Sequence, residues 1–286
     1  MPGLHVIGRI RRYFNDLEDR QRIAIALAKG ARMAARRIDP GDPASWEFSA
    51  FSQNGEDGVL DVLRGQLRAR NRSFIEIGAS DGIDNNTAWL AIAEKYGGLM
   101  IEGDARKSTR ARRLLPGYAL AIDCMALFVT RASAADIAAR ALHADPDVCS
   151  LDIDGNDYHI AAALLDAGLR PKIWVVEYNA AFGPERRVSI AYSDTFDFTA
   201  AHPSQLYYGV SIAGWRALFA QRGYRFVSVE RNGVNAFFVD PACFDAAFLD
   251  GIRGLDYAEN RFQLHKFRAP WSEQFQRIAD LPLIEI

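Results

Sequence analysis

The sequence contains few cysteines. Its three, Cys124, Cys149 and Cys243, lie far apart, and none belongs to a C-x-x-C pattern. This spacing indicates neither a disulfide framework nor a zinc knuckle. We therefore expect a reducing, cytoplasmic compartment.

Long apolar runs and an excess of charge of either sign are also missing. No segment approaches the ~18 consecutive apolar residues of a membrane span. Charges interrupt the opening stretch MPGLHVIGRIRRYF too early for a signal-peptide core. The formal net charge is −2 over 286 residues, which argues against wholesale nucleic-acid binding. We expect a soluble protein without a transmembrane segment or a nucleic-acid partner.

The composition is that of a globular protein with one large core domain. Hydrophobic residues make up 49% of the chain, and its mass is 31.8 kDa, which allows one such domain with additional segments. The proline-containing segment 39-DPGDPAS-45 marks a boundary. We expect the core domain over residues 46–245 and a C-terminal extension, residues 246–286, packing on it.

Residues 1–45 are predicted to form a basic helical arm. Apolar residues recur at helical spacing, starting from Leu4 and Ile7, and eight arginines lie between residues 9 and 37. Two helices or one broken helix fit this pattern. The arm is either a packing helix with a solvated basic face or a surface for an anionic partner, a lipid or a second copy of the chain.

Beyond the boundary, strand patterns alternate with helix patterns. The expected strands are 74–79, 98–104, 118–124, 148–154 and 172–179. The expected helices are 86–96, 105–115, 132–142, 157–168 and 213–224. Near the end, Asn232-Gly233 separates two alternating segments, which is a strong hairpin signal. The sequence therefore predicts an α/β fold, with a mostly parallel sheet covered by helices on both faces and a C-terminal antiparallel hairpin.

The turn after the first predicted strand, in 73-SFIEIGASDGIDNNT-87, has the features of a ligand-binding loop. Gly78 and Gly82 let the backbone turn sharply and let a ligand approach. Their spacing is not the G-x-G-x-x-G of dinucleotide binding. Glu76 and Asp81 place carboxylates beside the turn, which suits a cationic ligand better than a phosphate. S-adenosylmethionine carries an ammonium and a sulfonium and no phosphate, and we expect it here, with Ser80 in the same loop.

Acidic residues also end the next two predicted strands. Glu102 is placed to accept both ribose hydroxyls, and Asp123 is placed to meet the adenine amino group. Ahead of the first strand, Gln53 and Glu56 could fold over the methionine end of the cofactor. Acids at such places can equally cap a turn or a helix.

A second acidic cluster is predicted opposite. Asp152 and Asp154 follow the fourth strand, and Glu177 ends the fifth. Since these strands adjoin in a doubly wound sheet, the three carboxylates should converge at its carboxyl edge. They could hold Mg²⁺ through oxygen ligands. Helix capping by Asn156 or Asp157 is the alternative.

A proton acceptor is predicted in the same place. Asp154 or Glu177 could accept the proton of a substrate hydroxyl, and Asp152 could also contact the cofactor. His159 is a further candidate base, although the helix on which it lies could simply bury an imidazole.

The motif order resembles the FkbM-type branch of class I S-adenosylmethionine-dependent methyltransferases, over about residues 50 to 240. The motifs that carry the resemblance are FSQNGEDG, FIEIGASDG, MIEGD, SLDIDGND, VVEYNAAFG and GYRFVSVERNGVNAFFV. The resemblance implies a seven-stranded Rossmann-like sheet and methyl transfer, commonly to an oxygen of a sugar or natural product.

Residue by residue, the resemblance covers most of the predicted cofactor site. Glu76, Gly78 and Gly82 match the glycine-rich loop, Glu102 the ribose acid and Asp123 the adenine contact. The pre-strand motif matches Ser52-Gln53 and Gly55-Glu56-Asp57. This chain departs from the family at DIDGND, residues 152–157, where many relatives carry D-x-E-G-x-E.

The expected function is methyl transfer from S-adenosylmethionine to a hydroxyl of a sugar, glycan or natural-product-like small molecule. Residues 188–212, rich in aromatic side chains, are expected to shape the acceptor pocket. One alternative is an NAD-dependent oxidoreductase, against which the missing G-x-G-x-x-G argues. Another is a non-catalytic binding module that recruits a partner through the basic arm.

Overall fold

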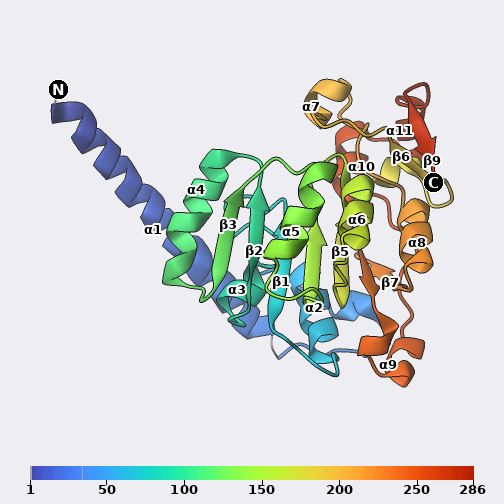
Figure 1. The fold of residues 1–286 in the computed structure, drawn as a ribbon, viewed down its shortest axis with the longest axis horizontal. Helices are drawn as coiled ribbons and strands as arrows, with labels where there is room; N and C mark the ends of the chain where they lie inside the picture. The colour runs from blue at the N-terminus through green and yellow to red at the C-terminus, as the bar shows by residue number, and fades with distance from the viewer. Residues whose placement is uncertain (1, 34) are drawn as a thin grey trace.

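The core of the molecule is a seven-stranded sheet with strand order β3-β2-β1-β4-β5-β8-β7 (Figure 1). The computed structural model describes residues 2–33 and 35–286, and side chains from residue 15 onward within these ranges. The strands of this sheet are β1 (Ser73–Ile77), β2 (Gly97–Glu102), β3 (Ile122–Ala126), β4 (Val148–Leu151), β5 (Ile173–Glu177), β7 (Arg225–Val229) and β8 (Asn235–Val239).

The first five strands are parallel, and the last two form an antiparallel hairpin. β8 pairs antiparallel with both β5 and β7, while β1 to β5 pair parallel with one another. The predicted Rossmann-like sheet with a C-terminal hairpin is confirmed. The strand order reverses at β1 and β4, and ligands bind at the carboxyl edge of such a reversal.

Helices cover both faces of the sheet. The α-helices of the described chain are α1 (Pro2–Met33), α2 (Glu56–Gly65), α3 (Ala88–Ile92), α4 (Ala105–Leu114), α5 (Ala134–Arg140), α6 (Asp157–Asp166), α7 (Phe198–Ala201), α8 (Ile212–Gln221), α9 (Ala246–Asp250), α10 (Arg261–Phe267) and α11 (Trp271–Gln276). The buried side chains of α1 to α4 form one apolar cluster, and those of α5, α6 and α8 form another. Neighbours on one strand alternate between the two clusters, as Phe74 and Ile75 do.

The N-terminal helix differs from its prediction. Instead of two helices or a broken one, α1 runs without interruption from Pro2 to Met33, and its start projects away from the body (Figure 1). Gly30 lies within this helix, and its lack of a side chain leaves room for the Trp89 ring, which lies 2.1 Å from where a Cβ would stand. Ile23 packs into the core. The apolar side chains predicted to line the start of this helix, Leu4 and Ile7 among them, lie outside the described residues.

Several strands end earlier than predicted, and one begins later. β4 ends at Leu151, so Asp152 and Asp154 lie in the loop that follows it. β3 covers Ile122–Ala126 instead of 118–124, because the short 3-10 helix Leu115–Gly117 and a turn at Tyr118 occupy the earlier residues. Asp123 is therefore the second residue of its strand and not the last.

The C-terminal segment adds elements that were not predicted. The strand β9 (Leu283–Glu285) pairs antiparallel with β6 (Val188–Ile190) in a separate small sheet. Together with α7, α10 and α11, this sheet lies above the carboxyl end of β5 (Figure 1). Short 3-10 helices cover Pro43–Ser45, Leu115–Gly117, Arg131–Ser133, Ala180–Phe182 and Pro241–Cys243. Among the helices of the described chain, none has both the length and the apolar character that a membrane span requires.

Candidate functional site

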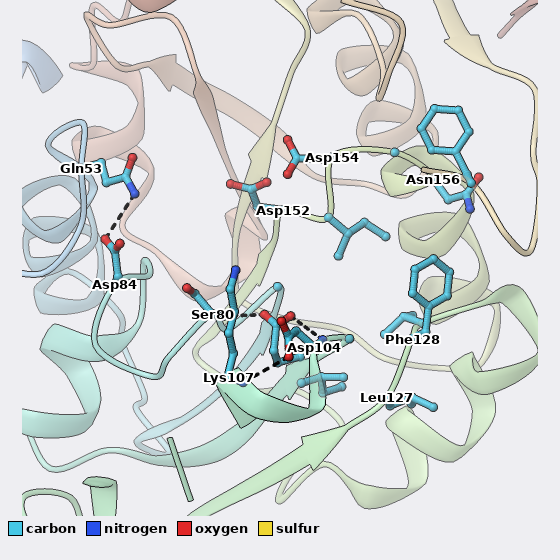
Figure 2. A pocket seen from close by; sticks show the side chains of 18 residues that line it. Gln53, Ser80, Asp84, Asp104, Lys107, Leu127, Phe128, Asp152, Asp154 and Asn156 are labelled. Atoms are coloured by element: carbon cyan, nitrogen blue, oxygen red, sulfur yellow. Dashed lines mark hydrogen bonds between the residues drawn. The ribbon is translucent and has the colours of Figure 1, made fainter. Parts of the chain in front are cut away.

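Two connected cavities open at the carboxyl edge of the sheet, where the strand order reverses. The larger has a volume of about 410 Å³, and we call it the cofactor-side cavity because the sequence predicts a cofactor at this edge. The smaller, the inner cavity, has a volume of about 290 Å³. Figure 2 shows Gln53 and Asp84 at one end of the larger cavity and Leu127 and Phe128 at the other. The walls that the two cavities share are Gln53, Gly78, Asp84, Asp152 and Asp154.

The loop after β1 approaches the loop after β4 very closely. Gly78 has a φ of +94°, and a Cβ on it would lie 1.7 Å from the carbonyl oxygen of Asp152. Only glycine fits both the left-handed backbone and this contact. Ser80 also has a left-handed φ, +50°, a conformation that costs energy in a residue other than glycine and concentrates at functional sites.

Glu102, the last residue of β2, is held at the rim of the cofactor-side cavity by backbone amides. One carboxylate oxygen accepts the amide of Ser80 at 2.7 Å, and the other accepts the amide of Asp104 at 2.8 Å. Both oxygens keep a lone pair for a ligand hydroxyl. The predicted ribose acid thus lines the cavity, beside the glycine loop.

Glu76 supplies a buried carboxylate with one free oxygen. Its side chain is 1% exposed and lines the inner cavity. Oε1 accepts the hydroxyl of Ser150 at 3.0 Å. Burial raises the pKa of Glu76 to about 8. The backbone amides of Asn86 and Thr87 lie close enough to lower the pKa of the carboxyl in part, but no donor meets Oε2 with hydrogen-bond geometry. A buried acceptor without a donor is costly, and a cationic group of a ligand would satisfy it.

The side chains of the segment before β1 reach the same cavities. The Nε2 amide of Gln53 donates to Asp84 at 3.2 Å. Glu56 accepts the side-chain amide of Asn235 at 2.7 Å and the backbone amide of Asn54 at 2.7 Å. Gln53 lines both cavities, and Glu56 lines the inner one.

The far end of the cofactor-side cavity has an apolar wall that the sequence did not indicate. Ile101, Leu127, Phe128 and Val129 line it. Phe128 is 55% exposed, so its ring is available to a flat ligand group. Leu127 directly follows β3, which ends at Ala126 and not at residue 124 as predicted. Its place at the carboxyl edge of the sheet was therefore not expected.

Asp152, Asp154 and Glu177 converge as predicted. Each offers an oxygen, and these oxygens all lie within 4.8 Å of one another. Burial first, and then the neighbouring carboxylates, raise the pKa of Glu177 and of Asp152. Burial also raises the pKa of Asp154, while the ammonium of Lys107 lowers it in part. Such a set can hold a shared proton or a cation with oxygen ligands.

The backbone of the DIDGND loop is set by Asp157. Its two oxygens accept the amides of Ile153 at 2.9 Å and Gly155 at 2.8 Å, which leaves Asp154 between them with a φ of +51°. The loop therefore turns in a way that directs Asp154 into the cavities, where Figure 2 shows it beside Asp152.

Two predicted residues of the glycine loop face away from both cavities. Asp81 accepts a hydrogen bond from Arg22 of α1 at 2.7 Å, so it joins the N-terminal helix to this loop. Gly82 has a φ of +85° and packs against Ala111 of α4. Asp81 and Gly82 therefore stabilise the loop through contacts with α1 and α4.

Asp123 and His159 also lie outside the linings of the two cavities. Asp123 pairs with Arg140 at 2.7 Å on the surface. The imidazole of His159 is bonded to the carbonyl of Ile190 at 2.9 Å and to Arg131 at 2.7 Å. Burial lowers the pKa of His159.

No protein-family model matches this chain, and no curated protein matches it in sequence. Several solved structures are similar to it at low identity. An O-methyltransferase from Bacillus cereus in complex with SAH is 14% identical over 77% of this chain and 88% of its own, with a TM-score of 0.41. The CurJ carbon methyltransferase is 13% identical over 84% and 70%, with a TM-score of 0.41. A precorrin-6y C5,15-methyltransferase from Geobacter metallireducens is 13% identical over 63% and 86%, with a TM-score of 0.36.

Proposed function

We propose that this chain is an S-adenosylmethionine-dependent O-methyltransferase of the FkbM-type branch. The observation that carries the proposal is the unpaired, buried Oε2 of Glu76 at the inner cavity, which shares Gly78 and Asp152 with the cofactor-side cavity that Glu102 borders. The lining of the cavities fits S-adenosylmethionine. Carboxylates would accept hydrogen bonds from its ammonium and its ribose hydroxyls, and apolar side chains would pack against its adenine. A diphosphate would meet several carboxylates at the same places.

The proposal assigns a part of the ligand to each wall. Glu76 holds the ammonium, and Glu102 accepts the ribose hydroxyls. Leu127 and Phe128 pack against the adenine, at the end of β3 where Asp123 was expected. Gln53 lies at the opposite end of the cavity from Phe128 (Figure 2) and covers the methionine portion.

The catalytic step needs a proton acceptor and alignment more than covalent help from the protein. S-adenosylmethionine supplies an electrophilic methyl group on a sulfonium. When an acceptor oxygen takes the methyl group, the carbon–sulfur bond breaks, its electron pair stays on sulfur, and the hydroxyl proton must leave. Asp154 accepts that proton, because it lines both cavities and its raised pKa makes it a better base than an exposed aspartate.

We also propose that Asp152, Asp154 and Glu177 hold Mg²⁺. Two observations support a magnesium site. The three carboxylates offer oxygens within 4.8 Å of one another. The carboxamide oxygen of Asn235 is buried without a hydrogen-bond partner, and Asn235 lines the inner cavity. A bound divalent cation would lower the pKa of a coordinated hydroxyl. Without the ion, Asp154 or Glu177 accepts the proton. With the ion, these carboxylates would be its ligands, and the coordinated hydroxyl would lose its proton more readily. Chelation separates the two mechanisms.

The remaining assignments follow from sequence and are proposals as well. The acceptor is a hydroxyl of a sugar, glycan or natural-product-like molecule, and the protein is cytoplasmic, in accord with its three free cysteines. We retain the division into an arm (1–45), a core domain (46–245) and an extension (246–286). The arm is the candidate surface for a second copy of the chain.

Calorimetric titration tests the proposed function. The intact protein should bind S-adenosylhomocysteine and should not bind NAD⁺. Binding of NAD⁺ alone would replace the proposal with an oxidoreductase. If S-adenosylhomocysteine binds but S-adenosylmethionine methylates no member of an acceptor panel, the non-catalytic binding module becomes the better description.

A further inference from the structure

We infer that the methyl acceptor is a polyhydroxylated ring bound in a third cavity, between α10 and the segment 198–208. This inference rests on the proposed function and deepens it, because it locates the acceptor at the same carboxylates. The cavity has a volume of about 190 Å³. Its lining residues are Asp154, Glu177, Phe198, Gln205, Leu206, Tyr208, Asn260, Phe262, Gln263, Lys266 and Phe267.

The position of this acceptor cavity suits methyl transfer. Asp154 borders the cofactor-side cavity, the inner cavity and the acceptor cavity, and Glu177 borders the last two. The carboxylates therefore form a wall between the proposed cofactor and the acceptor. A hydroxyl entering from the α10 side meets its base at that wall.

Gln263 shows that the acceptor cavity is built for a polar ligand. Its side chain is 6% exposed, and its Nε2 donates to the hydroxyl of Tyr208 at 3.1 Å. Its Oε1 has no partner. Asn260 caps α10 and accepts the backbone amide of Gln263 at 3.0 Å, which holds Gln263 at the start of the helix. A ligand hydroxyl would supply the donor that the buried oxygen lacks.

Aromatic rings and carboxamides surround that oxygen. Phe262 is 71% exposed and lies beside the cavity, where its ring can cover an apolar face of a ligand. Phe198 packs against Tyr208 with ring centroids 6.2 Å apart. Gln205 and Lys266 are bonded to each other at 3.1 Å. Carboxamides both donate and accept, as hydroxyls do, so the lining matches a ring with several hydroxyls and an apolar C–H face.

Saturation-transfer NMR with a panel of methyl glycosides tests the inference, using intact protein saturated with S-adenosylhomocysteine. At least one methyl pyranoside should receive saturation. Phe262→Ala and Gln263→Leu should each weaken its binding about 10-fold, the loss expected for one ring face or one hydrogen bond to a buried group. Because Phe262 is exposed, its replacement tests the site without endangering the fold.

Thr195→Ala is the control. Thr195 is exposed and lines an open groove over residues 194–198, but it lines neither the acceptor cavity nor the two cavities of the proposed cofactor site. Its replacement should leave glycoside binding unchanged.

Three results separate the failures. If S-adenosylhomocysteine does not bind, the proposed function fails. If it binds and no glycoside receives saturation, the ring assignment is overturned. If a glycoside binds but only Thr195→Ala weakens it, the acceptor lies in the groove and the inference is overturned.

Discussion

The cofactor-side cavity and the acceptor cavity are built in different ways. The first is formed largely by loops that directly follow β1, β2, β3 and β4, and its close contacts involve backbone atoms, as between Gly78 and Asp152. The second is formed by Asp154 and Glu177 together with side chains of α7, α10 and the chain between them. The proposed cofactor site therefore depends mainly on turns at the sheet edge, whereas the proposed acceptor site depends on segments distant in sequence.

The largest effect is expected at the carboxylate wall that the two cavities share. Asp154→Asn should lower the rate of methyl transfer by about 100-fold or more, because the base is lost. The dissociation constant of S-adenosylhomocysteine should change by less than about threefold. Radiolabelled S-adenosylmethionine with an acceptor from the glycoside panel measures the rate. Asp194→Asn, in the neighbouring groove, is the control. Equal rates for Asp154→Asn and the wild type would remove the base from the proposal.

Removal of a divalent cation should have the next largest effect. Dialysis against excess chelator should reduce methyl transfer by about 10- to 100-fold, because the cation no longer stabilises the charge that develops on the acceptor oxygen. Mn²⁺ followed by electron paramagnetic resonance should bind one ion per chain, and Glu177→Gln should abolish this binding. Unchanged transfer after chelation, together with no Mn²⁺ binding, would leave only the metal-free mechanism.

A smaller effect should show that cofactor binding and glycoside binding depend on different residues. Glu102→Ala should weaken S-adenosylhomocysteine binding by about 10- to 100-fold, the cost of a lost charged acceptor, while glycoside binding stays the same. Asp123→Ala, which removes an exposed carboxylate paired with Arg140, should change neither constant. Calorimetry measures the first constant and NMR the second. A loss of cofactor affinity in Asp123→Ala would restore the adenine contact predicted from sequence.

The smallest effect concerns the backbone of the cofactor-side cavity alone. Gly78 and Gly168 have almost the same φ, +94° and +95°, but a Cβ on Gly168 would meet nothing within 4 Å. Alanine is destabilised by the left-handed backbone at both positions. The additional loss of unfolding free energy in Gly78→Ala, relative to Gly168→Ala, therefore measures the contact with Asp152. We expect a difference of about 1–3 kcal/mol by chemical denaturation. Equal losses of unfolding free energy in the two variants would show that the loops after β1 and β4 can move apart with little loss of stability.

The sheet and the carboxylate cluster were predicted more accurately than which individual side chains line the cavities. Alternating strand and helix patterns identified β1 to β5, and the acids after β4 and β5 were expected to meet, as they do. The apolar wall of the cofactor-side cavity was missed, because Leu127 and Phe128 are ordinary apolar residues until the end of β3 is known. Asp81 was placed beside the ligand, although Arg22, 59 residues away, holds it elsewhere.

The periodic elements and the acids at the ends of parallel strands can be read from the amino-acid order, because strand period and turn geometry depend on neighbouring residues. Three features depend instead on the folded chain: Glu76 keeps an unpaired oxygen, Asp123 lies on the surface, and α10 closes a cavity beside Gln263. Those outcomes depend on which distant groups compete for each polar atom. That competition is settled by packing across the whole chain.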